Sequence, residues 1–484
     1  MNRERAETYL RLLAEAELGR ARRLLADSLA GGQEGQKGQG GGAAAGHSTR
    51  LTQVAHALSA VHAIDTGIVE EIKADFDLAI AVRLPGELGK TGPRGQLRAR
   101  MMGHQPVPPG AYTFSGLGAR RVVPVGQVIR IRTYDTRGEL CLLAYTQTAD
   151  SAWFTVSGWV DGSLDGSPTT YGPRPGPAGL APQEQLAPAG GPPLHRQFTA
   201  TDDRSARYQL GFSGGQSGGD LEGVLHLRPD PSHEIRWLDL STTPGEAAAR
   251  INLDPRDPPP DITVTQSVAS PGEFVLNGIA ARLLATGPGP VSRAADGLGD
   301  IIGALQAAGA LSPSSPVPGQ LARLCASLGI SGHGITAPVA SELPGPWLSV
   351  LTYYERGKPS PAHGLGTWAT VVAELPEMDG AQVALLGLHQ SEHDTIVHML
   401  AGGVALEHDW PQIRRLKPMP VLWIRGSGGD WHTTRLAGMN SKGGGEVMFR
   451  LAIVPPLDRG DTCIEVIATG QSGEVRALLP LRWV

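Results

Sequence analysis

The chain has 484 residues, of which 40% are apolar and 18% charged, and its net charge is −5. It contains no dense block of basic residues and no run of ~18 apolar residues, which argues against non-specific nucleic-acid binding and against a membrane-spanning helix. The 65 glycines and 39 prolines make up about a fifth of the residues and favour turns and short strands over long helices.

The cysteines and the N-terminal segment indicate the compartment. Cys141, Cys325 and Cys463 are odd in number and far apart, as expected for buried free thiols in a reducing environment. Residues 1–25 are rich in Arg and Glu and lack the apolar core of a signal peptide. We therefore expect a cytoplasmic protein.

The first 84 residues are predicted to be helical. Apolar residues recur at helical spacing over 4–27, and a second helical pattern covers 50–83 with a break at 65–67. The Gly-rich segment 29–48 between them is expected to be a flexible tether, and the Gly- and Pro-rich segment 85–118 reads as a linker.

The rest of the chain divides into two β regions with helices between them. Short alternating segments closed by Gly, Pro, Asp or Ser predict strands over 119–256 and again over 365–484. The intervening 257–346 contains a short strand near Ile262 and then a helical insert over about 272–328, and the chain is expected to return to strands from Trp347 onward.

The two β regions look like diverged copies of one module. Residues 138–147 align with 381–390, and 222–229 align with 446–455. Shorter matches pair 237–240 with 463–466 and 250–253 with 476–479. Short alternating strands need packed sheets or a closed barrel to bury one face. A duplication therefore predicts two β modules, each with its own packed sheets or barrel.

The segment Phe198–Tyr208, with the Gly-rich turn after it and the strand Trp237–Leu240, resembles immunoglobulin-like modules of uncharacterised bacterial proteins, some of which accompany anti-sigma-factor-like chains. The resemblance covers about 60 residues and implies a β-sandwich. It transfers no catalytic or binding residue. The predicted fold class is therefore mainly β, with two diverged immunoglobulin-like sandwich modules, a helical insert between them and a helical N-terminus.

Two catalytic motifs occur in the wrong context. His389-Gln-Ser-Glu392-His393 matches the H-x-x-E-H pattern of zinc peptidases, which requires a helix, yet its flanks alternate as strands. Gly211-Phe-Ser213-Gly-Gly215 matches the G-x-S-x-G nucleophile elbow, but no helix is predicted after it, so we interpret it as a Gly-rich hairpin loop. No catalytic, cofactor-binding or metal-binding residue is assigned.

Three weaker patterns point to binding. The segment Gly86–Thr91 resembles a phosphate loop, but Leu84 stands where the first glycine is required. Helices over 298–328 have helix-turn-helix spacing, but the few basic residues of the insert are balanced by acidic ones, which does not suit DNA. The run Asp202-Asp203-Arg204 could hold a cation, although such pairs more often cap a turn.

Taken together, these features predict a non-enzymatic protein-interaction or scaffold protein without cofactors, bound to another protein through helices 4–27 and 50–83. Amphipathic helices of this length are marginal alone, so their apolar faces need each other, a partner or a second copy of the chain. The first alternative is a transcription-linked regulator that binds a sigma-type factor through these helices. A metal-dependent hydrolase using His389, Glu392 and His393 is a more distant one.

Overall fold

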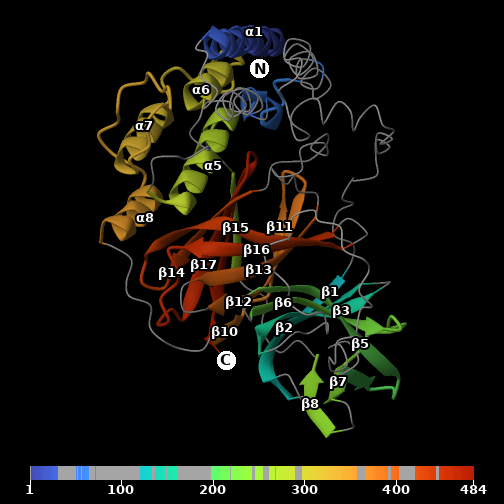
Figure 1. Cartoon of the computed structure of the whole chain (residues 1–484). Helices are drawn as coiled ribbons and strands as arrows, with labels where there is room; N and C mark the ends of the chain where they lie inside the picture. The colour runs from blue at the N-terminus through green and yellow to red at the C-terminus, as the bar shows by residue number, and fades with distance from the viewer. Residues whose placement is uncertain are drawn as a thin grey trace.

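The computed structural model of the chain comprises a helical unit and two β modules (Figure 1). It describes residues 2–30, most of 51–64, residue 71, 120–132, 137–148, 151–161, 198–217, 220–242, 246–253, 261–266, 269–288, 297–356, 367–390, 394–402, 420–442 and 446–483. The predicted tether from residue 31 onward and the linker 85–118 lie outside these residues. None of the described helices is both long and apolar enough to cross a membrane.

Module 1 is one curled antiparallel sheet of eight strands in the order β1-β2-β3-β6-β5-β4-β7-β8. Its concave face encloses an apolar core that includes Leu142, Phe154, Leu225 and Leu240. The strands are β1 Arg120–Arg132, β2 Arg137–Thr148, β3 Ala152–Asp161, β4 Phe198–Asp202, β5 Arg207–Ser217, β6 Asp220–Arg228, β7 Trp237–Thr242 and β8 Glu246–Asn252.

Module 2 is a second curled antiparallel sheet, of eleven strands, around its own apolar core. Its order is β19-β10-β12-β13-β16-β15-β14-β17-β18-β9, and β11 pairs with β12. The strands are β9 Asp261–Gln266, β10 Thr367–Thr370, β11 Ala373–Met378, β12 Ala381–Gln390, β13 Thr395–Gly402, β14 Val421–Gly426, β15 Trp431–Lys442, β16 Glu446–Val454, β17 Cys463–Thr469, β18 Gly473–Pro480 and β19 Arg482–Trp483.

The two modules share one strand order. If β10 and β11 together correspond to β1, the order β11-β12-β13-β16-β15-β14-β17-β18 repeats that of module 1. The repeat segments proposed from the sequence fall on matching strands: β2 with β12, β6 with β16, β7 with β17 and β8 with β18. This agreement in topology supports a duplicated module, and it places both copies in continuous curled sheets.

The register supports the same correspondence and corrects one part of the alignment. β2 breaks its pairing with β3 between Leu142 and Ala144, and β12 breaks its pairing with β13 between Leu385 and Gly387. The predicted match of 250–253 with 476–479 is out of step, because Leu238 pairs with Ile251 whereas Ile464 pairs with Leu479. The structural equivalent of Ile251 is therefore Leu479, two residues further along the chain than the alignment placed it.

The helical unit contains α1 Arg3–Ala30, a helical turn within 51–60, α5 Pro271–Thr286, α6 Leu298–Ala307, α7 Val317–Ser327 and α8 Gly345–Arg356. The start of α5 follows from its sequence, because Ser270 and Glu273 form a capping box around Pro271. The prediction that the chain returns to strands at Trp347 was wrong. Trp347, Val350 and Leu351 are buried on one face of α8, a spacing of three to four residues that fits a helix better than a strand.

The N-terminal helices pack within this unit. Ala6 and Leu10 of α1, together with Leu58 and Val61, share a core with α5, α6 and α7. The hydroxyl of Tyr9 lies close to Gly303 of α6, so a side chain at that position would collide with it. The described part of the apolar stripe of α1 is therefore buried inside the chain, where the sequence left open whether it packs on the other N-terminal helix, a partner or a second copy.

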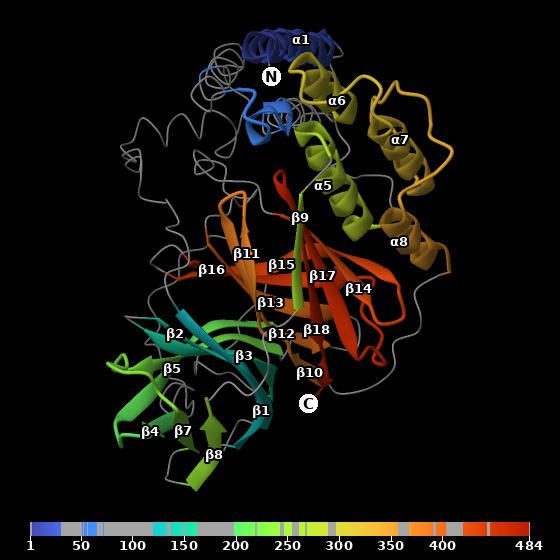
Figure 2. The ribbon, with the colours of Figure 1, turned by 180° about the vertical axis from the view of Figure 1, so that it is seen from behind.

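The helical unit rests on module 2 (Figures 1 and 2). Trp423 of β14 and Ile467 of β17 belong to the core of the helical unit. Thr433 on β15 donates a hydrogen bond from Oγ1 to the carbonyl of Ala281 in α5, and the backbone N–H of Trp431 donates to Ser349 Oγ in α8. Apolar burial and specific hydrogen bonds thus both position the helices on this sheet.

Modules 1 and 2 meet through the outer faces of matching strands. One shared cluster unites Ala144, Trp153 and Val224 of module 1 with Ala384, Leu386, Leu400 and Met448 of module 2. At its edge Gly387 lies against Leu143, so that an added Cβ would meet Leu143 Cβ at 3.0 Å. The two β-bulges therefore lie against one another, and equivalent strands supply the two sides of the interface.

Candidate functional sites

Asp202, at the end of β4, is the centre of a compact polar cluster. Its Oδ1 accepts hydrogen bonds from the backbone N–H of Arg204 at 2.9 Å and of Ala206 at 2.8 Å. Its Oδ2 accepts the Tyr208 hydroxyl at 2.8 Å and lies 2.9 Å from His233 Nε2. The carboxylate thereby closes the β4–β5 turn and connects it to the loop that carries His233.

The electrostatics of this cluster favour a charged carboxylate. Burial by itself raises the pKa of Asp202, but the hydrogen bonds from Tyr208, Ala206 and Arg204 and the nearby His233 outweigh it, and the net pKa is lowered. Burial and the Asp202 carboxylate together raise the pKa of Tyr208. The phenol therefore stays protonated and continues to donate at neutral pH.

Asp202, Asp203 and His233 offer ligand atoms within 4.8 Å of one another. However, Asp202 Oδ1 already accepts two backbone N–H groups, Asp202 Oδ2 accepts the Tyr208 hydroxyl, and Asp203 Oδ1 accepts the backbone N–H of Arg236. A cation would have to displace these donors. The arrangement performs turn capping, which is the interpretation that the sequence favoured for this acidic pair.

The H-x-x-E-H motif begins on a strand. His389 lies in β12 and pairs in register with Ile396 of β13 and Trp368 of β10. Its ring stacks on that of Trp368, with centroids 5.6 Å apart and planes 14° apart. Glu392 and His393 lie outside the described residues. The helix that would place two histidines one turn apart on a metal is therefore not present at His389.

The G-x-S-x-G motif is part of a strand. Residues 211–215 lie within β5, and each pairs in register with β6, Ser213 with Val224 for example. The prediction of a hairpin loop at these residues was wrong, because the strand continues to Ser217. A nucleophile elbow needs a sharp turn from strand to helix, which a residue paired in mid-strand cannot form. The segment 86–91 lies outside the described residues.

Buried thiols offer no reactive nucleophile. Burial raises the pKa of Cys141 to about 12 and that of Cys325 to about 11. Thiols with such values are protonated at neutral pH, and the thiolate is the nucleophilic form. Both cysteines are therefore buried structural residues, as predicted from their isolation in the sequence, but the same prediction was wrong for Cys463, which is only partly buried.

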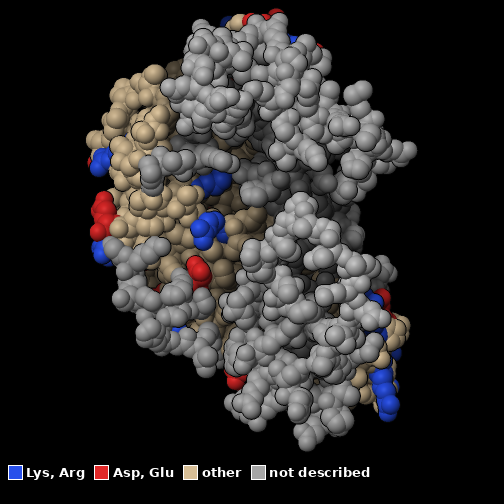
Figure 3. Space-filling model, in the orientation of Figure 1, with Lys and Arg blue, Asp and Glu red and all other residues tan. Residues whose placement is uncertain are grey.

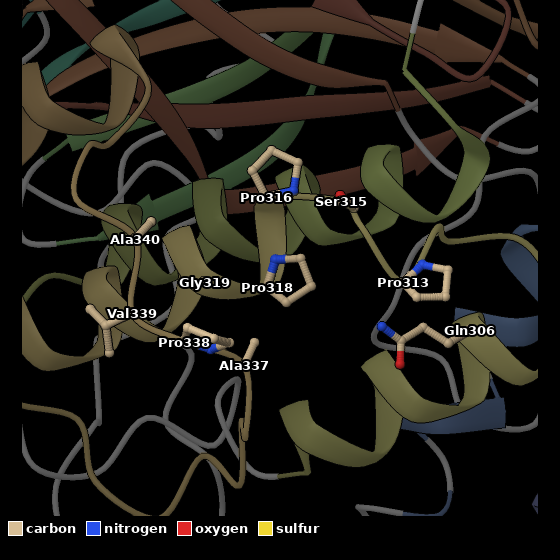
Figure 4. A pocket seen from close by; sticks show the side chains of 10 residues that line it. All are labelled: Gln306, Pro313, Ser315, Pro316, Pro318, Gly319, Ala337, Pro338, Val339 and Ala340. Atoms are coloured by element: carbon tan, nitrogen blue, oxygen red, sulfur yellow. The ribbon is translucent and has the colours of Figure 1, made fainter.

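A hollow of about 350 Å³ opens beside the N-terminus of α7 (Figure 4). Prolines and small residues form most of its wall, and Gln306 of α6 reaches it from the side. The hydroxyl of Ser315, which also lines it, donates to Glu273 Oε1 at 2.7 Å. The lining thus lacks the convergent polar groups with which a small-molecule site fixes its ligand.

His398 is a buried polar residue in an apolar strand of module 2. It lies on β13, opposite Gly387 of β12 and Arg450 of β16, and it is fully buried. Neither ring nitrogen has a hydrogen-bond partner among the described residues. Burial, and secondarily the neighbouring His389, lowers the pKa of His398 to about 3, so its imidazole is neutral at physiological pH.

The sequence offered little sign of this position. His398 sits in a strand of otherwise apolar residues, Thr395–Gly402, and a lone histidine in such a strand reads as an ordinary core residue. The available signal was the repeat: with Leu385 matched to Leu142, the register places His398 where module 1 has Thr155. Thr155 is also fully buried, and its hydroxyl likewise lacks a partner within the described part of the chain.

Charged side chains do not gather on the face shown in Figure 3, where the described ones are few and scattered among uncharged residues. Elsewhere they form local ion pairs, such as Arg250 with Asp239 and Arg476 with Glu474.

The comparisons with known proteins identify no relative. A scan of family models gave no match, and a search of curated proteins gave none either. Among solved structures, the chain is similar to one described as the crystal structure of the conserved domain protein from Bacillus anthracis, at 7% sequence identity and a TM-score of 0.15. The match covers 79% of this chain and 95% of that one. A TM-score at this level carries no argument about fold or function.

Proposed function

We propose that the chain is a non-enzymatic scaffold that binds other proteins in the cytoplasm. The observation that carries this proposal is the fusion of three cores into one frame: the helical unit is packed on module 2, and module 2 is packed on module 1, through buried apolar contacts. A frame of this kind holds its exposed helices and loops at fixed positions, which suits the display of binding surfaces.

We place the surface that contacts the partner on the helical unit, on the side that faces solvent. Ala6, Leu10 and Leu13 of α1 are buried within the chain itself. Leu12 of α1 and Leu348 of α8 are 60% and 52% exposed. Large apolar side chains on such surfaces commonly serve as anchors of protein interfaces. The partner proposed here is another protein, and a second copy of the chain is a competing outcome of the same experiment.

We also propose that both modules are immunoglobulin-like, module 1 by the resemblance of its segment 198–240 and module 2 through its match to module 1. The support is their antiparallel strands, which enclose one core in each module, and the presence in module 1 of the segment that carries the resemblance, on β4 and β5.

The scaffold proposal is tested with the full-length chain as immobilised bait in extract of its native host, followed by binding measurements on the purified partner. We expect Leu12→Glu or Leu348→Glu to weaken binding about tenfold or more, an effect typical of a lost apolar anchor. Leu478→Glu is the matched control, because Leu478 is 51% exposed on β18. Failure of the wild-type chain to retain any partner, or equal effects of all three variants, would overturn the proposal.

A further inference from the structure

β9 occupies a special place in module 2. The chain leaves module 1 after β8 and then adds residues 261–266 to the other sheet, outside the eight-strand order that the modules share. β9 pairs antiparallel with β18, with Asp261 opposite Leu478 and Val264 opposite Val475. The outer edge of β18 therefore accepts an extended segment as an added strand. We call such a position, at the outer edge of the last shared strand, a strand seat.

Module 1 contains the equivalent seat. Because Ile251 corresponds to Leu479, the stretch of β18 that β9 covers corresponds to the part of β8 around Glu246–Arg250. β8 is the last strand of the eight-stranded sheet, so no described strand pairs with its outer edge. In module 2 this edge position is paired with β9, whereas in module 1 no described strand pairs with it.

The closure of the curled sheet does not block this seat. Module 2 closes beyond β18, where Arg482 and Trp483 pair with Thr370 and Ala369. Module 1 closes at the corresponding place, where Leu253 O accepts a hydrogen bond from the Arg121 guanidinium. In module 2 this closure coexists with β9, which pairs with the earlier part of the same strand.

β8 carries little chemical protection at its outer edge, because its sequence from Glu246 to Asn252 has no proline and no lysine. One protective feature is present: Leu240 pairs with Ala249 and Ser241 with Ala247, so Ala248 forms a β-bulge that an added strand has to accommodate. The exposed Arg250 of β8 is held against β7: the guanidinium makes two hydrogen bonds to Asp239, at 2.7 and 2.6 Å, and lies 4.1 Å from the ring centroid of Trp237. The charge is thus engaged on the neighbouring strand.

β9 shows which kind of segment such a seat takes. Its four central residues, Ile262–Thr265, are all β-branched and uncharged, and most of its side chains are exposed. Only Ile262 packs against the core of module 2. Attachment therefore depends mainly on backbone hydrogen bonds, with one apolar side chain as an anchor.

We propose that the outer edge of β8, at Glu246–Arg250, binds an extended segment of a partner protein as an added antiparallel strand. The segment is β-branched and uncharged over about four residues, like β9. This inference rests on the proposed function in one respect, that the occupant is another protein, and it adds a binding surface distinct from the helical unit.

The probe is a labelled synthetic peptide of residues 260–267, and its control is a peptide of the same composition in scrambled order. Each is titrated into the full-length chain, with anisotropy as the binding readout and amide hydrogen exchange as the map. We expect saturable binding that is at least about tenfold tighter for the native order and new protection at 246–250. Binding without protection there overturns the proposal, as does protection confined to 473–478 or 261–266, which would indicate exchange with β9 or pairing with its free edge.

Two proline variants give a second test. Along a regularly paired strand the N–H groups of neighbouring residues point to opposite sides, and Glu246 and Ala247 pair in unbroken register with Thr242 and Ser241. In Glu246→Pro and Ala247→Pro one variant therefore loses an outward N–H and the other a bond to β7. The variant that keeps the wild-type Tm is expected to lose peptide binding at least about tenfold, and unchanged binding in it overturns the proposal. If both variants unfold, the exchange map decides.

Two outcomes assign the edge differently. Amide hydrogen exchange is also measured without peptide at several concentrations of the chain. Protection of 246–250 that rises with concentration would mean that a second copy of the chain binds the edge, and would overturn the proposal. A partner whose binding is lost with Leu12→Glu but kept in the folded proline variant, with no peptide protection of β8, leaves the scaffold proposal standing while the edge proposal fails.

Discussion

Replacement of His398 by leucine should stabilise the protein and reduce its sensitivity to acid. At pH 7 the imidazole is neutral and buried without a hydrogen-bond partner among the described residues, and a buried group in this state costs ~1–3 kcal/mol. Leucine has a similar volume and no polar atom. We expect His398→Leu to raise the free energy of unfolding by about 1 kcal/mol at pH 7, after allowance for imperfect packing.

The pH dependence is the sharper part of this prediction. The pKa of His398 is lowered from 6.5 to about 3 in the folded chain, so below pH 6.5 the unfolded state binds a proton that the folded state does not. The free energy of unfolding therefore falls as the pH drops from about 6.5 towards 3. The loss reaches about 2 kcal/mol at pH 5, and about 5 kcal/mol is its upper limit.

Urea unfolding of the wild type and of His398→Leu, at intervals from pH 8 to pH 5, measures this difference directly. The stability gap between the two proteins should widen by about 2 kcal/mol at the acidic end. His62→Asn is the control for removal of a histidine elsewhere in the chain, because His62 is exposed and has a φ of 54° that asparagine tolerates. Parallel profiles for the wild type and His398→Leu would refute the reasoning, since they would mean that the imidazole titrates alike in the folded and unfolded chains.

Three further predictions concern packing, charge and metal content. Gly387→Val should destabilise the chain by ~1–3 kcal/mol through collision with Leu143, and Leu143→Ala should recover part of that loss, which a double-mutant cycle in urea would reveal as non-additivity. Asp202→Asn should cost ~1–3 kcal/mol at pH 7 and less as the pH falls below about 4, because the lowered pKa of this carboxyl contributes stability only while it is charged, and Asp203→Asn should cost less. Elemental analysis of the purified full-length chain should find zinc well below one equivalent, whereas a stoichiometric content would favour the hydrolase alternative.

Much of the fold could be predicted from the sequence because its strands follow simple alternation. In β18 buried and more exposed residues alternate along the whole strand, a pattern that identifies a strand with one buried face. The weak repeat was also informative, since its matched segments fall on equivalent strands of the two sheets. Such local signals lie in the chain itself and need no knowledge of what packs against them.

The errors arose where tertiary contacts decide. The apolar and aromatic residues of 345–356 suit either a strand or a helix, and their packing with α5 and β15 selects α8. The glycines at 214 and 215 suggested a loop, yet they pair in register with Gly223 and Glu222 of β6. Propensity is a weak prior in such segments, because neighbours in space supply the missing hydrogen bonds and contacts.

The interface between the modules could not be predicted from patterning, because it buries the second face of strands that already bury their first. In β12 the residues from Val383 to Gln390 are all buried, with Leu385 in the core of module 2 and Leu386 in the cluster that joins the modules. Such a run indicates burial on both sides without saying which side faces what. If the modules arose by duplication, they began with the same outer face, and they can pack through it only if their bulges fit. The register matches Leu143 with Leu386 and Ala144 with Gly387. The contact of Gly387 with Leu143 meets the condition, because module 2 has glycine where module 1 has Ala144 and so leaves room for the leucine. The absence of a Cβ on one side only is thus a physical reason for the two modules to differ at this position.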